Sequence, residues 1–365
     1  MQAGSDHVKS QDLGLDVRDL CHSFSGHQVV DHVAFSVEPG SVHCLMGPSG
    51  CGKTTTLRLI AGLDRVQAGA ISLDGKLLAQ PGLWTPPEHR GIGMMFQDLA
   101  LFPHLNVADN VGFGIRHLAA KERARRVAQL LESVSLSAHA QKYPHMMSGG
   151  ERQRVALARA LAPEPHLMLL DEAFSALDAS LRDEVRSEIL SVLRARGVPT
   201  LLVTHDPEEA IATGDQIHVM QHGAIIQTGT PDELYAKPVN SFVARFFGPV
   251  LKIPTRVEQG FAATPFGPVK AAQFAQGDDV EVMLRSEAIG MRLPALGEEG
   301  DATVVHCRRM GPACVITMKM RHGPIITLKK PSETPHEEGL PICLDLDASQ
   351  AFVFPAKPGA RPQTN

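Results

Sequence analysis

A glycine-rich segment, residues 47–54, constrains this chain more than any other part of its sequence. It reads Gly-Pro-Ser-Gly-Cys-Gly-Lys-Thr and satisfies the pattern GxxxxGK[ST]. Residues 41–46 precede it as an expected buried strand, and helical periodicity follows over residues 54–63. Because the pattern carries meaning between a strand and a helix, it predicts a loop whose backbone N–H groups surround phosphate.

The residue types of this phosphate loop assign roles to its members. Glycines let the backbone turn closely around phosphates, and the start of the following helix adds partial positive charge. Lys53 is expected to bridge the terminal phosphates, and the Thr54 hydroxyl to bind Mg²⁺. The predicted nucleotide-binding residues of the loop are Gly47, Pro48, Ser49, Gly50, Cys51, Gly52, Lys53, Thr54 and Thr55.

A second acidic element follows at residues 166–172, His-Leu-Met-Leu-Leu-Asp-Glu. Four apolar residues predict a buried strand that ends in two adjacent carboxylates. Paired acids at a strand end also occur in solvated turns and at helix caps. With a phosphate loop upstream, we expect Asp171 to hold Mg²⁺ through water and Glu172 to polarise an attacking water.

Composition excludes several other classes of protein. The formal net charge is −5, without a long basic run, which argues against nucleic-acid binding. No secretory signal and no apolar run long enough to span a bilayer is present, so we expect a cytoplasmic chain. The six cysteines form no CxxC pair, which favours a reducing compartment over a zinc or disulfide scaffold. We interpret His218 and His222 as surface residues.

The order of patterns along the 365 residues predicts two main domains. Short buried strands are expected at residues 92–96, 167–170 and 201–204, alternating with helices, so the first domain should hold a largely parallel sheet covered on both faces. Leu181, Val185, Ile189 and Val192 lie on one face of a helix. A helical insertion is expected between residues 97 and 162. Short alternating runs at 279–284, 302–306 and 313–318 indicate a small β-domain.

The predicted limits are a disordered start at 1–12, an α/β domain at 13–247 with a helical subdomain at about 98–163, a β-domain at 248–356 and a loose tail at 357–365.

A second motif reduces the number of protein classes that the phosphate loop leaves open. It lies at residues 148–154, Ser-Gly-Gly-Glu-Arg-Gln-Arg. They precede an expected helix over 155–161 and resemble the signature motif LSGGQ of the ABC ATPases. An isolated SGG is more often a helix cap, but this one lies between the phosphate loop and the acidic strand. The resemblance implies that Ser148, Gly149, Gly150 and Glu151 bind the γ-phosphate of an ATP molecule held by a second subunit. It thereby implies a homodimer.

The remaining family motifs occur in family order. Phe24 resembles the aromatic residue that stacks on adenine. Gln97 resembles the Q-loop glutamine, which contacts Mg²⁺ and the attacking water. Asp178, in Ser175-Ala176-Leu177-Asp178, resembles the D-loop residue at the dimer interface, and His205 resembles the switch histidine. Each of these alone has an ordinary structural explanation. Together they imply an ATPase with Glu172, His205 and Gln97 as catalytic residues, and with Thr54, Gln97 and Asp171 at Mg²⁺.

Two positions depart from the family pattern. Glu151 replaces the common Gln, and Ala173 follows Glu172 where Pro is frequent. We expect the first to tune turnover, and the second to loosen the turn toward Phe174, without loss of activity.

The C-terminal part resembles the TOBE domain of importer ATPases. Residues 284–289, Leu-Arg-Ser-Glu-Ala-Ile, match its (V/L)RPE-like motif with Ser286 in place of Pro. The fold class implied is an α/β P-loop ABC ATPase domain, with a RecA-like core and a helical subdomain, followed by a small all-β TOBE domain of OB-like type.

The TOBE resemblance also implies how the protein works with others. The chain would energise an importer from the inner face of the membrane, together with integral permease subunits and, indirectly, a periplasmic solute-binding protein. Residues 101–103 are expected to help form the groove for a permease helix. Ferric iron is the favoured cargo, with polyamine, phosphonate, sulfate or sugar as alternatives. An ABC ATPase of DNA repair or translation is the alternative of a different class; the single cassette, without heptads or CxxC pairs, disfavours it.

Overall fold

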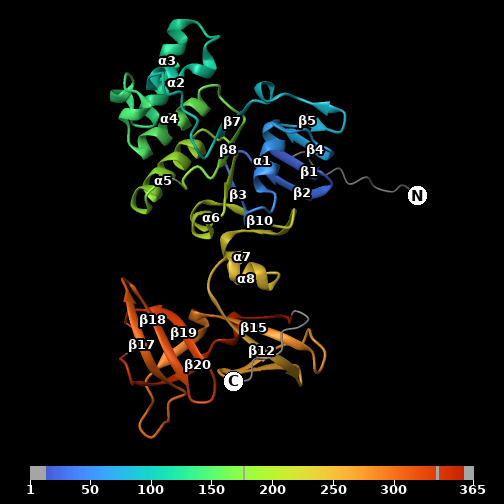
Figure 1. The fold of residues 1–365 in the computed structure, drawn as a ribbon, viewed down its shortest axis with the longest axis vertical. Helices are drawn as coiled ribbons and strands as arrows, with labels where there is room; N and C mark the ends of the chain where they lie inside the picture. Colours follow the sequence, from blue (N-terminus) through green and yellow to red (C-terminus); the bar gives the residue numbers. More distant parts are fainter. Residues whose placement is uncertain (1–13, 176, 334–336, 357–365) are drawn as a thin grey trace, which may run out of the picture. The chain divides into compact units, whose positions relative to one another are not determined.

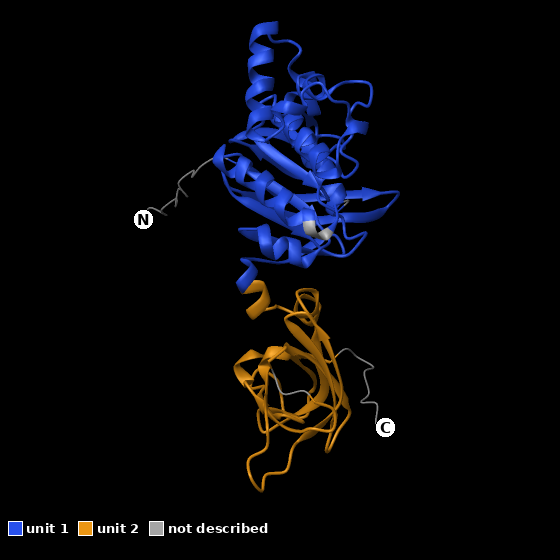
Figure 2. Cartoon of the chain, turned by 90° about the vertical axis from the view of Figure 1, so that its left-hand side faces the viewer, with its two compact units in different colours: residues 1–232 blue, residues 233–365 orange. Residues whose placement is uncertain are grey.

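The computed structural model describes residues 14–175, 177–333 and 337–356. The predictions for residues 1–12 and 357–365, and for Ala176, lie outside this described part. The described residues divide into two compact units, residues 1–232 and 233–365 (Figure 2). No helix in the described ranges is long and apolar enough to cross a membrane. The domain limits given above remain predictions.

The first sheet of unit 1 is antiparallel and buries one face. Leu15, Val17 and Leu20 on its first strand in sequence are almost fully buried, whereas Arg18 and Asp19 between them are exposed. Its strands, in spatial order, are β2 (His27–Val37), β1 (Leu15–Phe24), β4 (Ala68–Leu73), β5 (Lys76–Gln80) and β6 (Leu83–Trp84).

The second sheet of unit 1 is largely parallel, as the sequence predicts. All five residues of β3 (Val42–Met46) are buried, which fits a strand covered on both faces. The strand β3 pairs in parallel with β9, β9 with β8, and β8 with β7. The other strands of this sheet, in spatial order with β3 between β10 and β9, are β11 (Ala224–Gly229), β10 (Gln216–Gln221), β9 (Thr200–Thr204), β8 (Leu167–Asp171) and β7 (Ile92–Met95).

Helices pack on this parallel sheet. The helix α1 (Lys53–Ala61) contacts β8 and β9, and α6 (Pro207–Thr213) contacts β3 and β9. The helix α1 ends two residues before the predicted end because Gly62 adopts φ 84°, a left-handed C-cap that returns its N–H to the last carbonyls.

A helical group is inserted between β7 and β8, as predicted (Figure 1). It contains α2 (Val107–Val111), α3 (Ala120–Ser133) and α4 (Gly149–Leu161), and α4 packs on α5 (Ala179–Ala195). The helix α4 begins six residues earlier than the predicted 155. Ser148 caps its first turn, so the helix starts within the glycine pair itself.

The interpretation of His218 as a surface residue is wrong. His218 lies on β10 with 2% of its surface exposed, and its Nε2 lies 3.1 Å from Nδ1 of His43. Its Nδ1 lies 2.9 Å from Thr228 Oγ1, and His43 Nε2 lies 2.9 Å from a Glu38 carboxylate oxygen. The chain of polar contacts satisfies both buried rings. His222 is exposed, as expected.

Unit 2 is built mainly from antiparallel strands around an apolar core that includes Val282, Leu284 and Ile316. It begins with the end of α7 (Pro231–Ala236) and with α8 (Ser241–Phe246). One sheet has the order β14 (Gly267–Lys270), β13 (Phe261–Thr264), β12 (Val250–Glu258), β15 (Asp279–Arg285) and β21 (Ala351–Pro355). The other has the order β16 (Ile289–Arg292), β20 (Pro341–Leu346), β17 (Ala302–Met310), β18 (Ala313–Met320) and β19 (Ile325–Pro331).

The Leu-Arg-Ser-Glu segment ends β15 and opens a 3-10 turn at Ser286–Ala288. Arg285 is buried, with its guanidinium carbon 3.7 Å from the centre of the Tyr235 ring and 5.5 Å from that of Phe352. This cation–π packing joins α7, β15 and β21 within unit 2.

Candidate nucleotide site

The phosphate loop connects β3 to α1, and two of its glycines are required by close backbone contacts. A Cβ on Gly47 would lie 2.1 Å from the Met220 carbonyl oxygen, and one on Gly52 would lie 2.4 Å from that of Val29. Both residues also have positive φ, 156° and 107°. Pro48, Ser49 and Gly50 are exposed at the outer bend of the loop. The loop therefore presents its backbone at the surface while its two ends are fixed against neighbouring strands.

Lys53 is folded onto the same loop. Its Nζ donates to the carbonyl oxygens of Gly47 at 2.8 Å and Pro48 at 3.2 Å, and it lies 3.9 Å from Cys51 Sγ. Only 6% of Lys53 is exposed. At the start of α1, Thr54 is exposed and Thr55 is half-buried. The ammonium group is thus held against the backbone of the loop.

Strand order brings several predicted residues to one edge of the parallel sheet. The strands β7, β8, β9 and β3 are neighbours, and their carboxyl ends point the same way. Gln97 follows β7, Asp171 ends β8, and His205 follows β9. The phosphate loop follows β3 at the same edge, so residues more than 150 positions apart in sequence meet there.

Asp171 and Glu172 carry two neighbouring carboxylates into this edge. Burial raises the pKa of Asp171, the Glu172 charge raises it further, and the Lys53 ammonium lowers it. Such a carboxylate lacks sufficient positive charge around it, and a bound cation would supply that charge. The exposed hydroxyl of Thr54 offers a second hard oxygen donor of the type that Mg²⁺ prefers. The residues present therefore fit a magnesium ion.

Glu172 occupies an unusual backbone conformation, with φ 45°. Its N–H donates to Val203 O at 3.0 Å, and its own carbonyl accepts from the Ser175 hydroxyl at 2.8 Å. Ala173, which follows, is buried, and its carbonyl accepts a 2.7 Å hydrogen bond from Gln153 Nε2. The turn where Pro is frequent in relatives is thus held by these hydrogen bonds.

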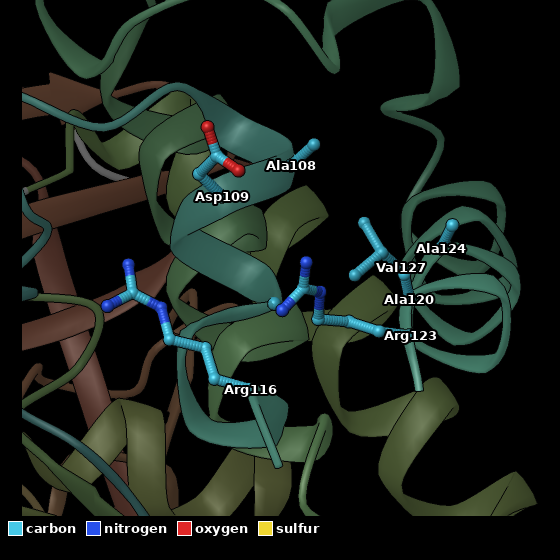
Figure 3. Close-up of a pocket in the computed structure, with 8 residues that line it drawn as sticks. Ala108, Asp109, Arg116, Ala120, Arg123, Ala124 and Val127 are labelled. Atoms are coloured by element: carbon cyan, nitrogen blue, oxygen red, sulfur yellow. The ribbon is translucent and has the colours of Figure 1, made fainter. Parts of the chain in front are cut away.

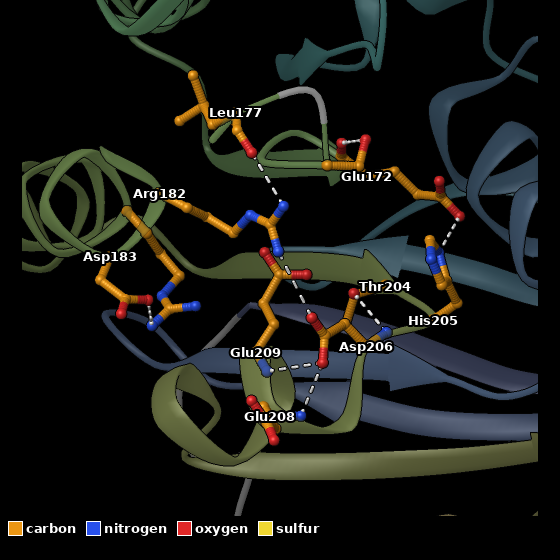
Figure 4. A network of polar contacts seen from close by, with 11 residues as sticks. Glu172, Leu177, Arg182, Asp183, Thr204, His205, Asp206, Glu208 and Glu209 are labelled. Carbon is orange, nitrogen blue, oxygen red and sulfur yellow. Dashed lines mark hydrogen bonds and ion pairs between the residues drawn. The ribbon is translucent and has the colours of Figure 1, made fainter. Parts of the chain in front are cut away.

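Glu172 also contacts the predicted switch histidine. His205 Nδ1 lies 3.0 Å from Glu172 Oε1, and the two side chains are 56% and 25% exposed (Figure 4). A carboxylate in this position fixes which imidazole nitrogen carries the proton and leaves Nε2 available to a ligand. The pair can orient and polarise a water molecule beside a phosphate.

The signature segment forms a capping box at the start of α4. Ser148 Oγ accepts from the Glu151 N–H at 3.3 Å, and the Glu151 carboxylate accepts from the Ser148 N–H at 2.7 Å. The backbone hydrogen bond from Ser148 is the main cause that lowers the pKa of Glu151. The charge of Glu151 is therefore engaged in its own helix start. The S-x-x-E spacing was available in the sequence as a signal for this cap.

The signature glycines lie against a neighbouring helix. A Cβ on Gly150 would lie 3.0 Å from Val185 and 3.2 Å from Leu181 of α5, and one on Gly149 would lie 3.3 Å from Leu177. In the part of the chain that the structure describes, no hydrogen bond or ion pair joins this segment to the phosphate loop of the same chain. The phosphate loop, the acidic strand and His205 are brought together, and the signature is not.

Arg182 joins the segment that follows the acidic strand to the segment that follows His205 (Figure 4). Its Nη2 donates to Leu177 O at 2.9 Å, and its Nη1 lies 3.8 Å from the Asp206 carboxylate. Asp206 caps α6 directly after His205 by accepting from the Glu208 N–H at 2.9 Å. Asp178 is exposed at the N-cap of α5, one residue after Leu177. Arg182, which sequence reasoning did not single out, thus links the D-loop segment to the histidine segment.

Phe24 and Gln97 are placed at the surface. Phe24 ends β1, is 48% exposed, and packs edge-on against His22 with ring centres 4.6 Å apart. Gln97 is exposed in the turn after β7. Both positions leave the side chains free to contact a ligand.

Arg159 of α4 is a second residue that sequence reasoning missed. Its guanidinium donates to Leu99 O at 2.8 Å and Ala100 O at 2.6 Å, in the turn that follows Gln97. Leu99 and Ala100 both have left-handed φ, 60° and 44°. The same guanidinium lies 5.6 Å from the centre of the Phe102 ring. The helix that starts with the signature therefore holds the turn after Gln97.

Phe102 leads from this turn to a groove in the helical group. Its ring centre lies 4.3 Å from that of Phe113, and the Arg116 guanidinium lies 4.2 Å from the Phe113 ring. Arg116 and Arg123 flank the groove together with Asp109 (Figure 3). The groove has a volume of about 360 Å³ and is lined by Ala108, Asp109, Gly112, Arg116, Ala120, Arg123, Ala124 and Val127.

Comparison with known families accounts for both units. Residues 30–175 match the family model described as ABC transporter, and residues 282–354 match the one described as TOBE domain. The Fe(3+) ions import ATP-binding protein FbpC 2 of Rhodococcus jostii (strain RHA1) is 44% identical over 310 residues, which is 85% of this chain and 88% of that protein. The chain belongs to the ABC transporter ATP-binding family. It is a transport ATPase that binds and hydrolyses ATP.

Other members of the ABC transporter family match to different extents. The putrescine transport ATP-binding protein PotG of Escherichia coli (strain K12) is 37% identical, covering 92% of this chain and 93% of that protein. The sulfate/thiosulfate import ATP-binding protein CysA 2 of Chromobacterium violaceum is 48% identical, covering 69% and 68%. Among solved structures, cbiO1 from Clostridium perfringens, part of the ABC transporter complex cbiONQ, matches with a TM-score of 0.57 and 28% identity, covering 62% of this chain and 92% of that one.

Proposed function

We propose that this ABC ATPase energises import of ferric iron. The carrying observation is its 44% identity to an Fe(3+) import ATP-binding protein over 310 residues, which extends well beyond the ATPase match at residues 30–175. The sulfate/thiosulfate relative is more identical, at 48%, but its match covers only 69% of this chain. Because the ATPase residues do not touch the cargo, similarity that includes the TOBE-like unit carries more weight. Putrescine import is the second candidate, since PotG covers 92% of the chain.

The residues at the sheet edge suggest how hydrolysis proceeds. The phosphate loop would hold the β- and γ-phosphates, and Lys53 would exchange its carbonyl partners at Gly47 and Pro48 for phosphate oxygens. Thr54, Asp171 and Gln97 would hold Mg²⁺, which supplies charge neutralisation at the phosphates when bound. Phe24 would stack on the adenine ring.

Glu172 and His205 are the proposed catalytic pair. The carboxylate of Glu172 would accept a proton from the attacking water, and His205, oriented through Nδ1 by the 3.0 Å contact, would donate from Nε2 to the γ-phosphate when both ring nitrogens carry a proton. Gln97 would position the same water.

A second copy of the chain would complete the site. The helix α4 begins at the signature residues, and backbone N–H groups at a helix N-terminus favour an anion. Within the described residues, no hydrogen bond or ion pair joins them to their own phosphate loop; the residues are Ser148, Gly149, Gly150 and Glu151. We propose that they bind the γ-phosphate held by the partner subunit, with Asp178 at the interface. ATP would then hold the homodimer together, and hydrolysis would release it.

The groove in the helical group is the proposed docking site for a permease helix. Its arginines fit an acidic side chain on that helix, and Phe102 and Phe113 join it to the turn after Gln97. The predicted residues 101–103 connect to the groove through this aromatic contact. The chain would therefore act at the inner face of the membrane, bound to permease subunits.

Uptake measurements test the cargo. Cells lacking this gene should lose uptake of labelled ferric iron but retain that of putrescine and sulfate. The wild-type chain should restore it, and Glu172→Gln, which should bind ATP and hardly hydrolyse it, should not. Loss of putrescine uptake with intact iron uptake would move the proposal to polyamines. Normal ATP turnover by Glu172→Gln would remove Glu172 from its proposed role.

A further inference from the structure

A bulge in the β1–β2 pair gathers side chains that the nucleotide site does not use. Leu20 pairs with Val33 and His22 with Val30, so Cys21 alone stands opposite two residues, Asp31 and His32. This two-against-one count is a β-bulge, a feature that redirects side chains and often lies beside functional sites. His32 has a left-handed φ of 49°. The bulge lies in the first sheet, where the strand β1 ends in Phe24 (Figure 1).

We propose that Cys21, Asp31 and His32 form a binding site for a divalent transition-metal ion of the Zn²⁺ type, with Asp19 orienting the histidine ring. One ligand atom from each of the three residues lies within 4.8 Å of the other two. His32 Nε2 and Asp31 Oδ1 are 3.8 Å apart. Zinc bonds of about 2.0–2.3 Å place tetrahedral ligands roughly 3.3–3.8 Å from one another, so small side-chain rotations complete the set.

Asp19 gives His32 the arrangement found around metal-binding histidines. The Asp19 carboxylate lies 2.5 Å from His32 Nδ1 and accepts a hydrogen bond from its N–H. This arrangement leaves the Nε2 lone pair for a metal ion. A carboxylate on the far nitrogen of a ligating histidine fixes the ring and raises its basicity. Asp19 also has a left-handed φ, 49°, two residues before Cys21 on β1.

The other two ligands are held in place as well. The backbone N–H of His32 donates to Cys21 Sγ at 3.3 Å, which holds the sulfur beside His32. Gln28 Nε2 donates to Asp31 Oδ1 at 2.6 Å. Asp31, Asp19 and His32 are between 46% and 70% exposed at their side chains, so an ion has free access. An exposed His32–Asp19 ion pair by itself would not account for the convergence of Cys21 and Asp31.

The donor set selects the chemical class of the ion. Thiolate and imidazole favour Zn²⁺, Fe²⁺ or Co²⁺ over Mg²⁺ and Ca²⁺, which prefer all-oxygen sites. Three protein ligands leave a fourth position for water. This site is therefore distinct in chemistry from the proposed magnesium position at Asp171.

Cobalt absorption tests the site directly, because a Co²⁺–thiolate bond gives a charge-transfer band. The full-length chain, free of affinity tag and saturated with MgATP, is titrated with Co²⁺. We expect one equivalent to produce the band and Zn²⁺ to displace it. Cys21→Ser should abolish the band. Cys307→Ser is the matched control, since Cys307 is the other half-exposed cysteine of the described residues, and should keep it.

Affinity for Zn²⁺ is measured in parallel by competition with a chelating indicator. Asp31→Asn and His32→Gln should weaken binding, and Asp19→Asn should weaken it by about 10–100-fold while keeping the Co²⁺ band. Melting temperatures of all variants should match the wild type, since these side chains lie at the surface. A band that persists in Cys21→Ser, no band in the wild type, or Zn²⁺ affinity unchanged by all three variants would overturn the proposal.

Discussion

Replacement of Arg159 by alanine should uncouple the turn after Gln97 from the helix that begins with the signature. Arg159 donates to the carbonyl oxygens of Leu99 and Ala100 at 2.8 and 2.6 Å. Both acceptor residues hold left-handed φ angles without being glycine. The two hydrogen bonds therefore keep a strained turn in one conformation.

The size of the effect follows from these contacts. Hydrogen bonds to a charged donor contribute about 1.5–3 kcal/mol each. Left-handed φ at a residue with a Cβ costs about 1–2 kcal/mol, and two such residues lie in the turn. Removing the guanidinium leaves this strain without its opposing bonds. We expect the free energy that favours the ordered turn over its other conformations to fall by about 3 kcal/mol. The ratio of ordered to other conformations then falls roughly a hundredfold.

The assay is ATP hydrolysis by the transporter reconstituted with its permease, together with hydrogen exchange of residues 96–103. Arg159→Ala should lower permease-stimulated hydrolysis at least about tenfold. Arg159→Lys should show stimulated hydrolysis between that of the wild type and that of Arg159→Ala, because an ammonium group lacks the planar fork that reaches two carbonyls. Arg126→Ala is the matched control. Arg126 donates to the Ala162 carbonyl at 3.2 Å in the same helical group, away from the turn.

Wild-type stimulation and unchanged hydrogen exchange in Arg159→Ala would refute the reasoning. An equal loss in Arg126→Ala would also refute it, because the effect would then be a general destabilisation of the helical group.

Three further predictions concern other residues of unit 1. Ser148→Arg should abolish hydrolysis without preventing ATP binding, measured by turnover and nucleotide-binding assays; surviving turnover would contradict the two-subunit site. Burial raises the pKa of the Cys51 thiol, so alkylation followed by mass spectrometry should be slow at neutral pH, faster above pH 9 and blocked by MgATP. Burial, and then the neighbouring His43, lower the pKa of His218 to about 3. Between pH 6.5 and 3, the unfolded chain therefore binds a proton at His218 that the folded chain does not bind. Stability should fall by about 1.4 kcal/mol per pH unit as pH drops below 6.5 toward 3, and His218→Gln should flatten this slope in thermal melts.

Local sequence determined much of the nucleotide-binding unit. The phosphate loop is recognisable because its glycines, Lys53 and Thr54 fall at fixed spacing within eight consecutive residues, between a strand and a helix. The close backbone approach of Gly47 to Met220 and of Gly52 to Val29 is a tertiary reason for two of these glycines. The strand β8 and its terminal acids are equally local, since a run of apolar residues followed by charge reads directly as a buried strand that reaches the surface.

Other features depended on contacts between distant segments. His218 looked like a surface residue because its neighbours in sequence gave no hint of His43, which is 175 positions away. Arg159 and Arg182 were overlooked because arginine on a helix is usually solvated, and only packing shows which carbonyl groups they reach. The early start of α4 was readable as a capping box, yet it was missed beside the stronger family motif.

The sequence by itself thus predicted which residues bind phosphate and metal, because those roles depend on residue type and on spacing within a single loop or strand end. Only the tertiary structure decided which of them meet. Parallel pairing of β3, β9 and β8 brings Lys53, Asp171 and His205 to one edge of the sheet. The same pairing leaves Ser148 on a separate helix start, because strand order is set by long-range burial and not by any local pattern.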